Sequence, residues 1–81
     1  MTALSARADS DDIDMSAVEL DVAAATAIAL DTVPGTVVEA ELEDEDGVVV
    51  REREVVGDGG QTRELSIDAA TGAVLENELD D

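Results

Sequence analysis

The sequence lacks cysteine, histidine, lysine and every aromatic residue. Without cysteine, neither a disulfide nor a thiolate-bound zinc site can form. The usual general bases and nucleophiles are also missing, and no histidine can activate Ser66 on its expected strand. Carboxylates lie close together by chance in so acidic a chain and do not by themselves indicate acid–base catalysis. We therefore expect no enzymatic activity, no cofactor and no metal.

Positive charge is scarce. The 81 residues include 22 acidic and 4 basic ones, all arginines, which gives a net charge of −18. Self-repulsion on this scale destabilises a compact chain in dilute buffer, and molar salt screens it. We attribute the composition to a high-salt cytoplasm; intrinsic disorder is the alternative, which the regular strand periodicity after Val37 disfavours. Without a basic patch or aromatic residues, nucleic acid is not an expected partner.

The chain also lacks long hydrophobic runs. No apolar stretch approaches the ~20 residues of a membrane span, and residues 1–16 have no apolar core of a secretory signal. We expect a cytoplasmic protein without membrane contact. The length allows one domain: residues 1–17 are expected to form an acidic, flexible N-terminal tail and residues 18–81 the folded domain. Met15 is an alternative start.

One helix is expected between residues 21 and 33. Asp21 is a good N-cap, with Leu20 and Ala25 in hydrophobic-staple positions, and Pro34-Gly35 ends the helix. The stripe predicted to face the core consists of Val22, Ala25, Thr26, Ala29 and Val33, with Leu30 at its edge.

Strand periodicity fills the rest of the chain. Alternation over residues 37–43 places Val38, Ala40 and Leu42 on one face and glutamates on the other. Further strands are expected over 48–56, 62–68 and 74–79, with turns at 44–47, 57–60 and 68–72. This spacing predicts an α+β fold, with one helix packed on a three- to four-stranded antiparallel β-meander.

The order of the predicted helix, strands and turns resembles that of a known domain family. A helix ending in Val33-Pro34-Gly35 leads into an acidic strand, Asp46-Gly47 forms a turn, and the third strand runs into Asp68-Ala69-Ala70-Thr71-Gly72 before an apolar pair. Over residues 20–75 this order resembles the PepSY domain family. The resemblance implies a domain that occurs in propeptides of thermolysin-type metalloproteases and as stand-alone proteins, and that inhibits or regulates peptidases.

The arginines depart from the family pattern, which usually has aromatic or aliphatic residues at these places. Arg51 and Arg53 share a strand face with Val49 and Val55, and an arginine stem tolerates partial burial, so we expect both on the helix side or at its rim. Three interpretations stay open: pairing with carboxylates of the same chain, a docking face for an acidic partner, and a small-anion site. For a docking face, the candidate partner-binding residues are Arg51, Arg53 and Arg63.

Two acidic turns resemble metal loops only superficially. Asp44-Glu45-Asp46-Gly47 matches part of an EF-hand loop, but the register would place Leu42 and Arg53 at the first and last ligand positions. A solvated turn is the better interpretation. The same holds for Asp58, where Gly59 and Gly60 are expected to supply positive φ.

The leading functional hypothesis is a non-catalytic binding or regulatory module whose partner is a protein, with a peptidase as the candidate. The alternative is a small homo-oligomeric protein of a halophile with no peptidase role, in which Arg51 and Arg53 lie at or beside a sheet contact between two copies. A small-ligand carrier is the third. An open apolar sheet face would favour self-association, and a concave pocket would favour the carrier.

Overall fold

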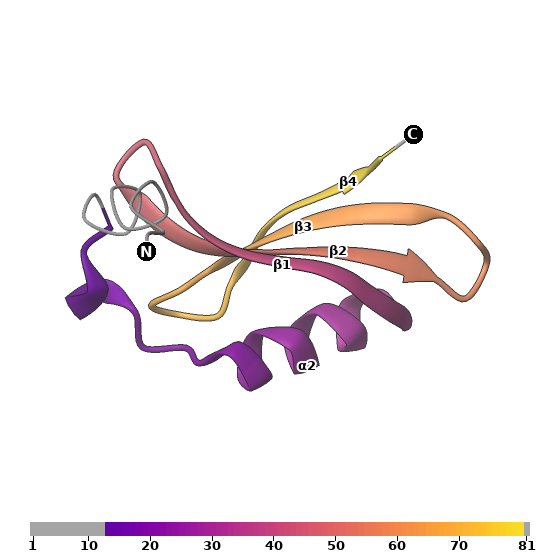
Figure 1. Cartoon of the computed structure of the whole chain (residues 1–81), viewed down its shortest axis with the longest axis horizontal. Helices are drawn as coiled ribbons and strands as arrows, with labels where there is room; N and C mark the ends of the chain where they lie inside the picture. Colours follow the sequence, from indigo (N-terminus) through magenta and orange to yellow (C-terminus); the bar gives the residue numbers. More distant parts are fainter. Residues whose placement is uncertain (1–12, 81) are drawn as a thin grey trace, which may run out of the picture.

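The computed structural model describes residues 13–80, so residues 1–12 of the expected tail lie outside it. The elements are η1 (Met15–Ala17), α2 (Val22–Thr32), β1 (Gly35–Glu45), β2 (Val48–Gly57), β3 (Thr62–Asp68) and β4 (Val74–Leu79). The strands form one antiparallel sheet in the order β1-β2-β3-β4, and α2 lies along one of its faces (Figure 1). This confirms the predicted α+β fold of one helix on a β-meander.

Both ends of α2 follow from local chemistry. The carboxylate of Asp21 accepts a hydrogen bond from the Ala24 N–H at 2.7 Å, which satisfies a donor of the first turn. At the other end the Val33 N–H donates to the Ala29 carbonyl at 2.8 Å, and Pro34 follows in the sequence. The predicted cap and the predicted end are confirmed. No helix within residues 13–80 has the length and apolar character needed to cross a bilayer.

The core lies between α2 and the middle of the sheet. Its fully buried members are Ala25, Ala29, Val55, Leu65 and Ile67, and the partly buried residues packed around them are Leu20, Ile28, Leu30, Val33 and Val37. Because the two alanines have short side chains, the helix backbone can lie close to the strands. A core with so little apolar area gives only modest stabilisation, at about 25 cal/mol per Å² buried.

Three apolar positions expected on the core side are exposed: Val22, Val38 and Ala40, the last of which lies on the edge strand β1. Val22 is 56% exposed, because the first turn of α2 lies over arginine side chains, and its carbonyl accepts a hydrogen bond from Arg53. Val38 is 55% exposed, because the pairing of β1 with β2 shifts register between Val37 and Glu39. This bulge inserts one extra residue, so that Val37 packs against the core in place of Val38.

The turns set the register of the sheet. Asp46 and Gly47 have φ of 55° and 88° and form a two-residue hairpin that places Glu45 opposite Val48. In the next turn Gly60 has positive φ and Gly59 does not, so the prediction for Gly59 is wrong. Positive φ at Gly72, in the expected third turn, is observed at 82°.

Candidate functional site

Arg51 and Arg53 extend from β2 towards α2, on the side of the sheet that the sequence favoured. Arg53 is 1% exposed and donates to Thr26 Oγ1 at 3.1 Å, the Val22 carbonyl at 3.2 Å and the Glu52 carbonyl at 2.8 Å. Arg51 Nε donates to the Leu20 carbonyl at 2.7 Å. Burial, and then the neighbouring charge of Arg51, lowers the pKa of Arg53. The two side chains hold the start of the helix onto the sheet.

The acceptors of these bonds differ from those expected. The sequence favoured pairing of the arginines with carboxylates, but every hydrogen bond of the three arginines within residues 13–80 goes to a neutral oxygen. The reason is the face on which they lie, because the strand glutamates point to the other side. With Arg53 enclosed between two layers, its role in binding a partner stays a prediction.

Arg63 lies apart from the other two, on β3 near the opposite end of the helix. Its Nε donates to Asn77 Oδ1 at 2.7 Å and its Nη2 to the Asn77 carbonyl at 3.4 Å. These bonds to β4 fix one edge of the guanidinium. Arg63 is half-buried and lines a cleft, so the structure separates it from the pair under the helix.

The cleft lies where the end of α2 passes the turn between β2 and β3. Its volume is about 280 Å³, and its lining residues are Val33, Pro34, Gly57, Asp58, Gly59, Gln61 and Arg63. Sequence reasoning did not identify this cleft, because its walls come from segments more than twenty residues apart. The proline-glycine and glycine-rich turns are the signals that mark its two sides.

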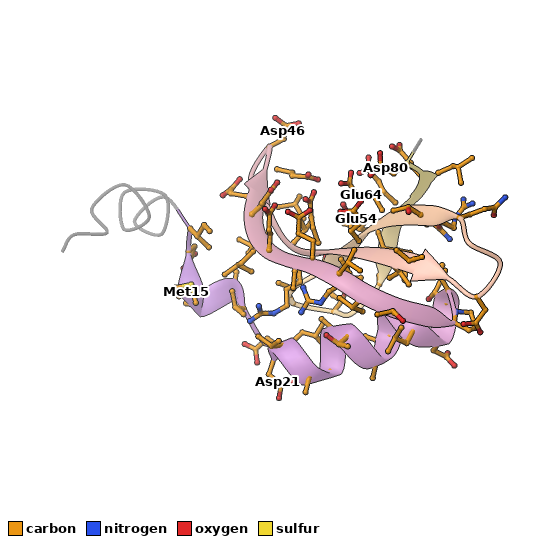
Figure 2. The ribbon with its side chains drawn as sticks, turned by 45° about the vertical axis from the view of Figure 1, so that its right-hand side comes forward. Met15, Asp21, Asp46, Glu54, Glu64 and Asp80 are labelled. Atoms are coloured by element: carbon orange, nitrogen blue, oxygen red, sulfur yellow. The ribbon has the colours of Figure 1, made fainter. Side chains whose placement is uncertain are left out.

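The face of the sheet opposite α2 carries rows of carboxylates. In one row Glu41, Glu52, Ser66 and Glu76 are cross-strand partners, and in the next the partners are Glu39, Glu54, Glu64 and Glu78. Figure 2 shows Glu54, Glu64 and Asp80 on this side, away from the helix. Like charges directly opposite one another destabilise a sheet, so this face is electrostatically strained.

The crowding changes the protonation of several glutamates. Desolvation, and then a hydrogen bond with Glu45, raises the pKa of Glu52 to about 8. Hydrogen bonds with Asp80 and Glu39 raise the pKa of Glu54 to about 7. A hydrogen bond with Glu41 raises the pKa of Glu43, and desolvation raises that of Glu64. Part of this face therefore binds protons near neutral pH.

Neither catalysis nor a metal is assigned to this face. Carboxylate oxygen atoms of Glu41, Glu43 and Glu52 lie within 4.8 Å of one another. Carboxylate oxygens are ligands that suit hard cations such as Ca²⁺. Acidic groups on an exposed face commonly gather in this way without an ion, so the geometry alone does not identify a site. Ser66 is 2% exposed and its hydroxyl lies 3.4 Å from Glu52 Oε2 and 3.3 Å from Glu76 Oε1, where no substrate reaches it directly.

Residues 19–78 match the family model of PepSY, described as the peptidase propeptide and YPEB domain. The matched range contains all of α2, β1, β2 and β3, and β4 up to its penultimate residue. Neither a curated protein nor a solved structure gives a significant match to the chain.

Proposed function

Because this chain belongs to the PepSY family of peptidase propeptide and YPEB domains, we propose that it is a non-catalytic module that regulates a peptidase by binding to it. The observation that carries the proposal is the extent of the match, which covers the helix and nearly the whole sheet. The extent of the match supports a role that involves the folded unit as a whole.

The side-chain chemistry supports a binding role over a catalytic one. The sequence has no histidine, cysteine, lysine or tyrosine, which are the groups most often used as bases and nucleophiles. Ser66 is buried beneath carboxylates of the open face. What the structure offers a partner is surface: a carboxylate face on one side of the sheet and a cleft at one end of it.

We also propose that the protein functions in a high-salt cytoplasm. A net charge of −18 on 81 residues, with carboxylates in register across the strands, is tolerable where salt shortens the range of repulsion. A peptidase in the same compartment would meet the module under those conditions, so its binding should be measured there.

The alternative function, a homo-oligomer without a peptidase role, has weaker support. An open apolar sheet face would have favoured it, and the open face carries glutamates instead. Two copies facing each other across this surface would repel. We assign Arg63 to contact with a partner, and Arg51 and Arg53 to the seating of the helix that keeps the sheet in shape.

Inhibition of a peptidase tests the proposal. A thermolysin-type metallopeptidase that is active in about 2 M KCl is titrated with the folded chain, and hydrolysis of a fluorogenic peptide is followed. We expect a saturable change in rate that the heat-unfolded chain does not produce. Unchanged hydrolysis by several such enzymes, together with no complex in sedimentation velocity, would remove the peptidase role.

A further inference from the structure

The cleft beside Arg63 has preformed walls. The Asp58 N–H donates to the Pro34 carbonyl at 3.0 Å and so ties the glycine-rich turn to the end of the helix segment. The Gly57 N–H donates to the Gln61 carbonyl at 2.7 Å, which closes the turn itself. Because main-chain bonds fix both sides, a ligand does not have to order this region when it binds.

The lining combines one cation with apolar surface. Val33 and Pro34 supply the apolar side, and Gln61 supplies an amide. Arg63 is held at Nε and Nη2 by Asn77, while its Nη1 makes no hydrogen bond within residues 13–80. A guanidinium fixed along one edge in this way can still donate to a carboxylate.

Of the three arginines within residues 13–80, Arg63 is the one that does not lie beneath α2 or the residues that lead into it. Arg51 and Arg53 hydrogen-bond to oxygens of the helix and of the residues before it. On a molecule with a net charge of −18, an anionic group meets repulsion over most of the surface and attraction at few places. Among the described arginines, Arg63 is the one that lines the cleft, so an anion bound there would meet a cation beside an apolar wall.

Size limits the ligand to roughly one residue of a peptide. Small-molecule sites begin at about 300 Å³, and this cleft has about 280 Å³. Val33 and Pro34 suit an aliphatic side chain, and Arg63 suits a carboxylate next to it. Asp58 lies in the same lining and disfavours a second carboxylate.

We propose that the cleft between Pro34, Gly59 and Arg63 binds a peptide through one aliphatic side chain and one adjacent carboxylate. The carboxylate comes either from the C-terminus of the peptide or from an acidic side chain. This site does not require the bound protein to be a peptidase, so it stands or falls separately from the function proposed above.

Three short peptides test the site and distinguish the two sources. One ends in Val-Leu with a free carboxylate, the second is the same peptide with an amidated C-terminus, and the third is an amidated peptide ending in Leu-Glu. Each is added to the ¹⁵N-labelled full chain in about 2 M KCl, and amide shifts of residues 33–35 and 57–63 are followed. Contacts this small suggest a Kd of about 1 mM, so titration extends to about 10 mM.

Matched variants locate the binding. Gly59 lines the cleft, and a side chain there would meet no atom within 4 Å and needs no unusual φ, so Gly59→Val adds bulk at the rim of the cleft without disturbing the fold. Arg63→Gln removes the charge, and Asp58→Asn removes the opposing one. For a carboxylate peptide we expect about tenfold weaker binding in Gly59→Val and Arg63→Gln and a few-fold tighter binding in Asp58→Asn.

The peptide titrations distinguish outcomes that support the site from outcomes that overturn it. The site is supported if the peptide with a free C-terminus, the Leu-Glu peptide or both bind at least tenfold more tightly than the amidated Val-Leu peptide, which has no carboxylate. Which of the two binds identifies the source of the carboxylate. Equal binding of all three peptides, binding unchanged in Gly59→Val and Arg63→Gln, or no shifts at about 10 mM overturns it. Peptidase inhibition that persists without peptide binding would leave the regulatory role standing and discard only this cleft.

Discussion

Arg53 Nε donates to Thr26 Oγ1 at 3.1 Å and thereby links the centre of β2 to α2 inside the molecule. The side chain is 1% exposed, and its other acceptors are main-chain carbonyls. A cation thus occupies a buried position beneath the helix, where the resemblance noted in the sequence implied an apolar residue. Filling volume and holding the helix are two separate roles of this side chain, and substitutions can separate them.

Arg53→Ala should lower the free energy of unfolding by about 3 kcal/mol, because it leaves a cavity and unpaired carbonyls beneath α2. Arg53→Met fills most of the volume but leaves the same acceptors unpaired, so it should recover part of the loss and destabilise by about 1 kcal/mol. Urea unfolding in about 2 M KCl measures both variants. If Arg53→Met is as unstable as Arg53→Ala, the hydrogen bonds of the guanidinium matter more than its volume.

Asp21→Ala should destabilise by about 1 kcal/mol, because the Ala24 N–H loses the acceptor that lies 2.7 Å away. Asp31→Ala is the matched control. It removes an exposed carboxylate from the last turn of the same helix, where the macrodipole disfavours negative charge, and should be neutral or slightly stabilising. Equal denaturant midpoints for the two variants would refute the capping role.

Gly72→Val should destabilise by more than about 1 kcal/mol for two reasons. The residue has φ of 82°, which β-branched residues avoid, and an added Cβ would lie 3.2 Å from Ile28 Cδ1. Gly59→Val, at a glycine with neither constraint, should leave the melting temperature nearly unchanged. Similar melting temperatures for the two variants would show that neither constraint at Gly72 matters.

The elements of the fold were predictable because their signals are local. Asp21, Pro34 and the glycine turns determine the conformation of residues next to them. Because successive side chains of a strand point to opposite faces, the sequences of β2 and β3 directly indicate which residues share a face. The bulge at Val38 was not predictable in this way, since one inserted residue leaves composition and alternation almost unchanged. The exposure of Val22 depends on where the arginines of β2 lie, which is a tertiary property.

The site was predictable only in part. The side of the sheet that carries Arg51 and Arg53 followed from strand periodicity, but their neutral acceptors required the position of the helix backbone. The carboxylate rows were within reach of sequence reasoning. A two-residue Asp46-Gly47 hairpin fixes Glu41 opposite Glu52, so the register could have been counted outward from the turn. The cleft required the tertiary structure.

Stability should fall as pH rises above about 5. The pKa of Glu52 is about 8 in the folded chain against 4.5 for the free group, so the folded state binds this proton more tightly. The associated stability is fully present below pH 4.5 and is lost as pH rises through 8. Melting temperatures between about pH 5 and pH 9 measure the effect, and Glu52→Gln should flatten the profile above pH 6. A profile that rises over this range would contradict the crowded-carboxylate account.

Salt should stabilise the chain strongly, because a net charge of −18 repels itself and ions screen that repulsion. The melting temperature should rise steeply from about 0.1 M to about 3 M KCl, and the pH dependence should weaken at the higher concentration. A melting temperature that does not change with KCl would remove the argument for a high-salt setting.

Hydrogen exchange on the intact chain, with and without a thermolysin-type metallopeptidase in about 2 M KCl, tests most directly both the regulatory role and its assignment to the cleft. The account predicts slower exchange in residues 57–63, because the peptidase covers the cleft. Exchange in α2 should not change, because Arg51 and Arg53 keep the helix packed on the sheet in both states. The same exchange pattern with and without the enzyme, at concentrations that give full inhibition in the kinetic assay, would contradict binding through this surface. No protection and no inhibition with any such enzyme would contradict the regulatory role itself.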